Sequence, residues 1–161
     1  MTVKPDVETD LSLLLTAASA GADEAVRRKL EEAGFGDVRR SHGYVFQHLL
    51  DGPLTIGRLA ELLGMTGQGA SKAVKELESL GYVLRTPDPE DARARLVGLT
   101  ERGHRVVSEA RAARGAFRDE VRTVLGEADA DQLLRSLQTL AIHTGGLDLL
   151  LRRKLKPAGG R

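Results

Sequence analysis

Residues 54–85, LTIGRLAELLGMTGQGASKAVKELESLGYVLR, decide the fold that this sequence predicts. Thr55 and Thr66 can each begin a helix, because a threonine hydroxyl accepts a hydrogen bond from a backbone N–H of the first turn. Gly64 lies between the two predicted helices, at a position where helices commonly end in a left-handed residue. Two short helices with a glycine at the joint predict a helix-turn-helix.

The second of these helices has one polar side and one apolar side. At about 100° per residue, the polar side carries Gln68, Ser71, Lys72, Lys75 and Ser79. The opposite side carries Ala70, Ala73, Val74, Leu77 and Leu80. Glu76 and Glu78 lie at the edges between the two sides. We therefore expect the apolar side to pack on the core. The polar side is either a solvated surface or a surface shaped to approach a partner.

A β-hairpin is predicted directly after this helix. Residues 83–85, VLR, read as a short strand, and residues 93–100, RARLVGLT, read as the returning strand. Residues 86–91, TPDPED, lie between them and are interpreted as an irregular turn, because they hold two prolines and clustered acids. Thr100 can cap the helix that follows. A hairpin after a helix-turn-helix predicts a wing.

Helical spacing of apolar residues predicts long helices on both sides of this region. The first begins at Leu11 and ends near Gly34. A shorter second helix is expected to begin with Ser41 as its cap. After the hairpin, one helix runs to Gly126 and a final helix follows, which residues 145–146, Gly-Gly, weaken. Whether the final helix continues past these glycines is left open. The predicted fold class is mainly α with a small β-hairpin wing.

Composition excludes several classes of function. The chain of 161 residues is 41% hydrophobic and 29% charged, which is typical of a soluble globular protein. It has no cysteine, so it forms no disulfide or thiolate metal site, and its four histidines are scattered. We predict no metal site and no cofactor. No signal core or membrane-spanning run is present, so a cytoplasmic location without a membrane partner is expected. No catalytic constellation indicates an enzyme.

Residues 54–103 resemble the winged helix-turn-helix of the MarR family of bacterial transcriptional regulators. The resemblance rests on residues 54–85 and on the wing, residues 88–103, DPEDARARLVGLTERG, in which Asp91-Ala92-Arg93 fits the family's Asp-x-Arg signature. The flanking helices also follow the order of the family. The resemblance implies three segments: residues 1–40 in a dimerisation region, residues 41–103 as the winged DNA-binding domain, and residues 104–161 as C-terminal dimerisation helices.

The same resemblance implies a function. A homodimer would bind double-stranded DNA at a pseudo-palindromic operator, usually to repress a neighbouring gene. A small-molecule effector, often aromatic or phenolic, would release the DNA; the residues that bind it are unknown. The alternative is a winged-helix protein without effector control, or one that acts mainly through a protein partner.

The polar side of the second helix would then contact DNA. A recognition helix enters the major groove with its N-terminus first, which places Gln68, Ser71 and Lys72 near base edges. Lys75 is interpreted as a phosphate contact, which fixes register without reading sequence. Thr66 lies at the start of the helix, where backbone N–H groups favour an anion such as phosphate.

The wing would supply the remaining contacts. By resemblance, Arg93 would insert into the minor groove, and Arg95 lies on the same hairpin. Asp91 would orient Arg93 through an ion pair. Cations and acids nevertheless balance over residues 54–100, so affinity must depend on where the charges lie. The cations are Arg58, Lys72, Lys75, Arg85, Arg93 and Arg95, and the acids are Glu61, Glu76, Glu78, Asp88, Glu90 and Asp91.

Overall fold

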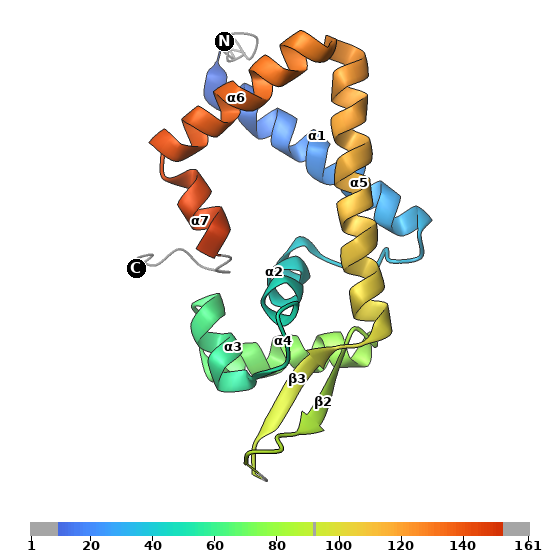
Figure 1. The fold of residues 1–161 in the computed structure, drawn as a ribbon, viewed down its shortest axis with the longest axis vertical. Helices are drawn as coiled ribbons and strands as arrows, with labels where there is room; N and C mark the ends of the chain where they lie inside the picture. The colour runs from blue at the N-terminus through green and yellow to red at the C-terminus, as the bar shows by residue number, and fades with distance from the viewer. Residues whose placement is uncertain (1–9, 92, 153–161) are drawn as a thin grey trace, which may run out of the picture.

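The computed structural model describes residues 10–91 and 93–152 and is mainly helical (Figure 1). The helices are α1 (Leu11–Glu32), α2 (Arg40–Leu49), α3 (Ile56–Leu63), α4 (Gly67–Ser79), α5 (Glu101–Leu125), α6 (Glu127–His143) and α7 (Gly146–Arg152). The strands are β1 (Leu54–Thr55), β2 (Val83–Pro87) and β3 (Arg95–Leu99). The predicted mainly helical fold with a winged helix-turn-helix is confirmed.

The wing belongs to a three-stranded antiparallel sheet rather than to a hairpin alone. Its strand order is β1-β3-β2, with Leu54 paired to Val97. The strand β1 was not predicted, because two residues before a helix give no alternation to recognise. The strand β2 runs on to Pro87, in the segment that was predicted to be a turn. Pro87 ends an edge strand, where its missing N–H costs no ladder hydrogen bond.

Three of the predicted helix caps are confirmed. The hydroxyl oxygens of Thr55, Thr66 and Thr100 each accept a backbone N–H bond from the residue three positions on, at 3.2, 3.1 and 3.1 Å. Gly64 ends α3 with φ 65°, in the left-handed region. The helix-turn-helix is therefore set by local sequence.

The predicted cap of α2 is wrong. This helix begins at Arg40, and Ser41 lies inside its first turn. The side chain of His42 reaches back instead, and its Nδ1 accepts the backbone N–H of Arg39 at 3.2 Å. His42 thereby satisfies a backbone donor that the helix itself leaves unpaired.

The core lies where α2, α3, α4, the sheet and the base of α5 meet. On α4, the predicted apolar side supplies Ala70, Val74 and Leu77, and none of the three is exposed. Tyr82 follows α4 and is also fully buried. A Cβ atom on Gly103 would lie 2.3 Å from the carbonyl oxygen of Tyr82, so only glycine lets α5 start this close to the end of α4.

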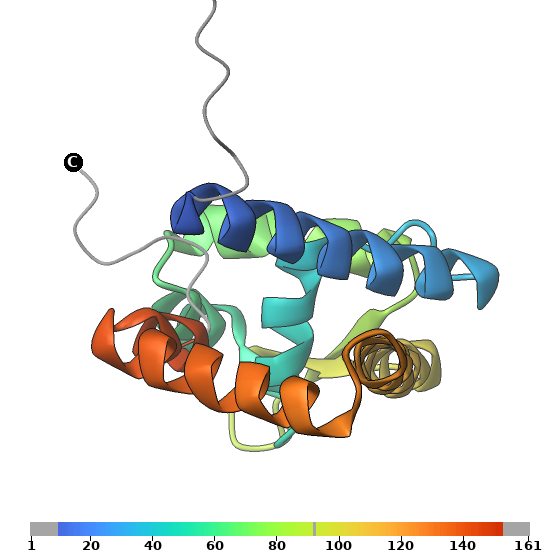
Figure 2. The ribbon, with the colours of Figure 1, turned by 90° about the horizontal axis from the view of Figure 1, so that it is seen from above.

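The long helices extend away from the winged domain. α5 rises from the sheet and packs across α1, while α6 and α7 continue from its far end (Figure 1). Figure 2 shows α1 and α6 on opposite sides of the molecule. Gly126 and Gly145, with φ of 82° and 73°, separate α5, α6 and α7. The final helix therefore breaks at the glycine pair. The segment boundaries at residues 40 and 103 remain a prediction.

Candidate nucleic-acid interface

The polar side of α4 faces outward as predicted. Gln68, Lys72 and Lys75 are exposed, whereas Ser71 is half-buried. None of the five residues of this face, Gln68, Ser71, Lys72, Lys75 and Ser79, is β-branched or aromatic. Of the predicted base-reading residues, Ser71 is the least accessible.

The start of α4 is built for close approach. Thr66 is exposed, and its oxygen accepts the N–H of Gly69 while its own hydroxyl proton stays free to donate. A Cβ on Gly69 would meet Met65 Cε at 3.0 Å and Thr66 Oγ1 at 3.3 Å. Gly69 therefore protects the cap. A phosphate oxygen could accept from the Thr66 hydroxyl and from the first free N–H groups of the helix.

The tip of the wing differs from the prediction at Asp91. Its carboxylate accepts the backbone N–H of Arg93 at 2.9 Å. Its backbone carbonyl accepts the N–H of Ala94, also at 2.9 Å. In the described part of the chain, the predicted ion pair between Asp91 and the Arg93 guanidinium is not formed. Asp91 shapes the turn, and Arg93 stays exposed.

Three acids of the winged domain pair with arginines at its edges. Glu61 pairs with Arg58 at 2.9 Å, both on α3. Glu78 of α4 lies 3.4 Å from Arg85 of β2. Glu76 pairs with Arg39, which precedes α2 and lies outside the segment whose charges balance. These three carboxylates therefore neutralise neighbouring arginines rather than the outward face of α4.

Four predicted DNA-contacting cations remain without an acid partner. Within residues 10–91 and 93–152, Lys72, Lys75, Arg93 and Arg95 form no ion pair, and all four are exposed. Two lie on α4 and two on or beside the wing. α4 therefore presents two unpaired lysines and the wing two unpaired arginines, beside Asp88, Glu90 and Asp91, although charges balance in number over residues 54–100.

Sequence reasoning missed the contacts that attach α2 to α4. His42 is 4% exposed, and its Nε2 lies 3.7 Å from Glu76 Oε1, beside the Arg39–Glu76 ion pair. Burial lowers the pKa of His42, with the positive charge of Arg39 adding to this and Asp37 opposing it. No local signal could have revealed this group, because Glu76 lies far from Arg39 and His42 in sequence.

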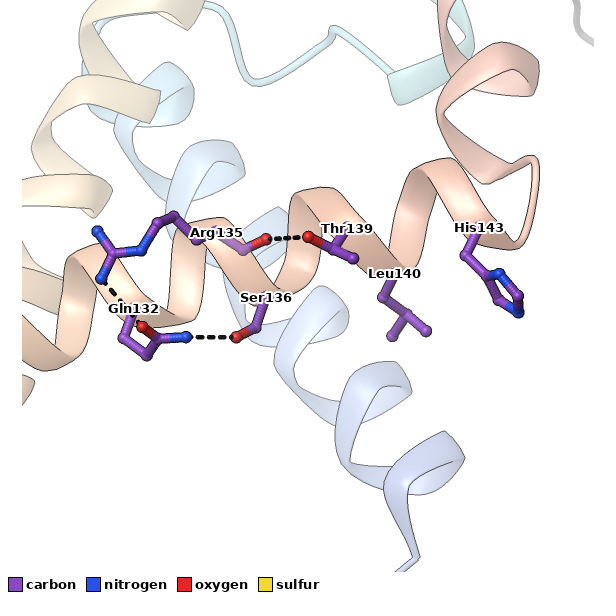
Figure 3. A pocket seen from close by; sticks show the side chains of 6 residues that line it. All are labelled: Gln132, Arg135, Ser136, Thr139, Leu140 and His143. Atoms are coloured by element: carbon purple, nitrogen blue, oxygen red, sulfur yellow. Dashed lines mark hydrogen bonds between the residues drawn. The ribbon is translucent and has the colours of Figure 1, made fainter.

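A hollow of about 490 Å³ lies on α6 and is separate from the winged domain. Its lining residues are Gln132, Arg135, Ser136, Thr139, Leu140 and His143 (Figure 3). All six come from one helix, and Gln132 bonds both Ser136 and Arg135 at 3.1 and 3.0 Å. The hollow therefore supports no assignment of effector-binding residues.

Two further observations concern metals and membranes. No three His, Asp or Glu side chains among the described residues are grouped so that they could hold a metal ion. None of the helices described is both long enough and apolar enough to cross a bilayer.

Comparison with known proteins places this arrangement in a family. The model described as MarR family matches residues 37–94, which span α2, the helix-turn-helix and the wing up to its tip. The matched segment, residues 37–94, is that of the MarR family. A transcriptional regulator of Thermotoga maritima, Tm0710, is 27% identical to this chain, with a TM-score of 0.59. The match covers 86% of this chain and 94% of Tm0710.

Other relatives agree with this assignment. An HTH-type transcriptional regulator of Mycobacterium tuberculosis is 32% identical over 92 residues, which are 57% of the present chain and 64% of the relative. A mutant of Staphylococcus aureus MepR, in complex with an oligodeoxyribonucleotide, is 24% identical, with 84% and 98% of the two chains covered and a TM-score of 0.62. This last likeness shows the fold alone.

One match has the name of an enzyme. Riboflavin kinase of Thermoplasma volcanium is 42% identical over 50 residues, which are 31% of this chain but only 21% of the kinase. The match leaves most of the kinase without a counterpart. The MarR-family assignment and the fold agree with the expectation that this protein is not an enzyme.

Proposed function

We propose that this MarR-family protein is a sequence-specific regulator that binds double-stranded DNA as a homodimer on a pseudo-palindromic operator. The observation that carries the proposal is which cations of the winged domain lack an acid partner among the described residues. The four cations without an acid partner, Lys72, Lys75, Arg93 and Arg95, lie on the helix and the wing that would enter the two grooves. Such charges release condensed counterions when they neutralise phosphates, which favours binding.

The roles of individual residues follow from position. Gln68, Ser71 and Lys72 lie in the first half of α4 and would read base edges, with the half-buried Ser71 contributing least. Lys75, farther along the same face, would bind phosphate. Thr66 would donate to a phosphate at the start of the helix. Arg93 would enter the minor groove, with its backbone held by Asp91 at 2.9 Å.

Exposed apolar side chains support a dimer through the long helices. They gather on α1, the end of α5, α6 and α7 and include Leu11, Leu14, Val124, Leu125, Leu133, Leu134, Leu137, Ile142, Leu149, Leu150 and Leu151. Val124 alone is 75% exposed. Apolar surface of this extent on a soluble chain marks a protein interface. A second copy would cover it and bring the two α4 helices to successive major grooves, about 34–36 Å apart.

The proposal extends to repression and release. Structures of MepR are known with an oligodeoxyribonucleotide and with ethidium bromide, so that relative binds both DNA and a small molecule. We infer by analogy that this protein is a repressor, acts in the cytoplasm and is released by a small ligand. Phenolic compounds are the first class to test.

The proposal is tested by selecting sites from a random double-stranded DNA library with the purified protein. Binding of the selected site and of random DNA is then measured by fluorescence anisotropy, for the wild type, Lys72→Ala and Arg93→Ala. The expected result is preference for the selected site and weaker binding in both variants. Failure to enrich any sequence would overturn the proposal and favour a protein partner for the polar face of α4.

A further inference from the structure

Four segments that are distant in sequence meet at the side chain of Tyr82. Tyr82 follows α4 closely and begins the path into β2. Its hydroxyl donates to Asp37 Oδ1, in the connection from α1 to α2, at 2.5 Å. Arg102, in the first turn of α5, donates to the same hydroxyl oxygen at 3.1 Å. The hydroxyl therefore joins the end of the recognition helix to the α1–α2 connection and to the first turn of α5.

Aromatic stacking holds this junction together. The ring of Tyr82 packs against Phe46 and Phe35, with centroids 5.6 and 6.3 Å away. The guanidinium carbon of Arg102 lies 4.7 Å from the Tyr82 centroid and 5.2 Å from that of Phe35. These are the distances of cation–π contacts. Arg102 also lies 3.5 Å from the carboxylate of Asp37.

The backbone of Tyr82 is held as firmly as its side chain. Its N–H donates to Leu77 at the end of α4, and its carbonyl accepts the N–H of Thr100 just before α5. The Thr100 hydroxyl donates to the carbonyl of Gly81 at 2.6 Å. Burial, with the hydrogen bond to Asp37, raises the pKa of Tyr82 to about 12. The hydroxyl therefore keeps its proton and its bond to Asp37 at every pH at which the protein would bind DNA.

We propose that Tyr82, Asp37 and Arg102 are positioning residues that fix the angle between α4 and α5, and so set the spacing between the two half-sites that the dimer accepts. This inference rests on the proposed function. α4 has 13 residues, which corresponds to about 20 Å. A rotation of about 10° at the junction would move its far end by about 3.5 Å, roughly the rise of one base pair.

The test compares Tyr82→Phe with a matched control, Tyr44→Phe. Tyr44 is half-buried on α2, and its hydroxyl bonds to none of the residues described. Both substitutions remove one hydroxyl and keep the ring. Asp37→Ala is a second variant at an exposed position, so it tests the same bond without altering the core. Asp37→Asn keeps an acceptor oxygen for the Tyr82 hydroxyl and should restore wild-type behaviour.

Each variant is assayed on three DNA duplexes built from the site that the wild type selects: a single half-site, the full site, and the full site with one base pair inserted between the halves. We expect the wild type to prefer the full site over the inserted site by about fivefold or more, the lower range of coupling between distant sites. Tyr82→Phe and Asp37→Ala should bind the half-site like the wild type and lose most of this preference. Tyr44→Phe should keep it.

A second readout needs no DNA. Because the chain has no cysteine, a spin label at Gln68→Cys reports the distance between the two α4 helices of a dimer. The distribution should broaden in Tyr82→Phe and Asp37→Ala. Unchanged spacing preference and unchanged distances would overturn the inference, as would half-site binding that weakens as much as full-site binding. Absence of coupling between labels would overturn it too, because spacing requires two protomers.

The two proposals fail separately. If the wild type selects no DNA sequence, the proposed function fails, and the label distances alone decide whether Tyr82 holds the angle. If the wild type selects a site and Tyr82→Phe keeps its spacing preference, the proposed function stands and the positioning role is wrong.

Discussion

Lys75→Ala tests whether the charge that the fold leaves unpaired is the charge that binds DNA. Lys75 is exposed on the outward side of α4 and has no acid partner within the described ranges. Each protomer would bring four such cations to the DNA, whether they read a base or bind a phosphate, so a bound dimer would displace the counterions of about eight phosphates. The slope of log K against log salt is then about −7, since each phosphate contributes about −0.9.

Removing Lys75 removes two of these contacts from the dimer. The slope should fall in magnitude from about −7 to about −5. Between 50 and 200 mM salt, the wild type should then lose about 10⁴-fold in affinity and the variant only about 10³-fold. Because a phosphate contact carries no sequence information, binding of the selected site and of random DNA should weaken by similar factors.

The measurement is fluorescence anisotropy across a salt series, with Lys29→Ala as the matched control. Lys29 lies on α1, outside the winged domain, and pairs with Glu32 at 2.9 Å. Its removal should leave the slope unchanged. An unchanged slope in Lys75→Ala would refute the phosphate contact. A loss confined to the selected site would show instead that Lys75 reads a base.

Three further outcomes follow from the packing and the charges. Gly103→Ala should lower the free energy of unfolding by about 1–3 kcal/mol, because its methyl group has no room. Gly115→Ala should raise the free energy of unfolding by up to about 1 kcal/mol, because nothing lies within 4 Å of the new methyl group. Thermal denaturation measures both changes. The lowered pKa of folded His42 means that the unfolded state binds more protons, so stability should fall as pH drops below about 6.5, and less so in His42→Gln. Asp91→Asn keeps an oxygen for the Arg93 N–H and should bind DNA nearly like the wild type, whereas Asp91→Ala should bind more weakly.

Local sequence predicted the helix-turn-helix because its signals act over a few residues. The hydroxyls of Thr55, Thr66 and Thr100 and the left-handed Gly64 each determine a helix end through contacts within three or four positions. Periodicity predicted the buried side of α4 for the same reason. In each case the physical cause lies within the stretch of sequence that reveals it.

The contacts that orient these elements could not be predicted in this way. The bond from Tyr82 to Asp37 spans 45 positions, and that from Arg102 to Asp37 spans 65. Asp37 lies in a connection without any periodic signal, and it became recognisable only when the fold brought it to the Tyr82 hydroxyl. The sequence therefore predicts the elements well and the angle between them poorly.

The charge that the winged domain presents also depends on contacts between residues that are distant in sequence. A count over residues 54–100 finds six cations and six acids, so affinity for DNA must depend on where these charges lie. The count misses Arg39, which lies outside that segment yet occupies Glu76 of α4. On the wing, Asp88 and Asp91 bond backbone N–H groups and keep their charge. Because Glu61, Glu76 and Glu78 are each paired with an arginine at the edge of the domain, a segment with balanced charges can still present unpaired lysines on the outward side of α4.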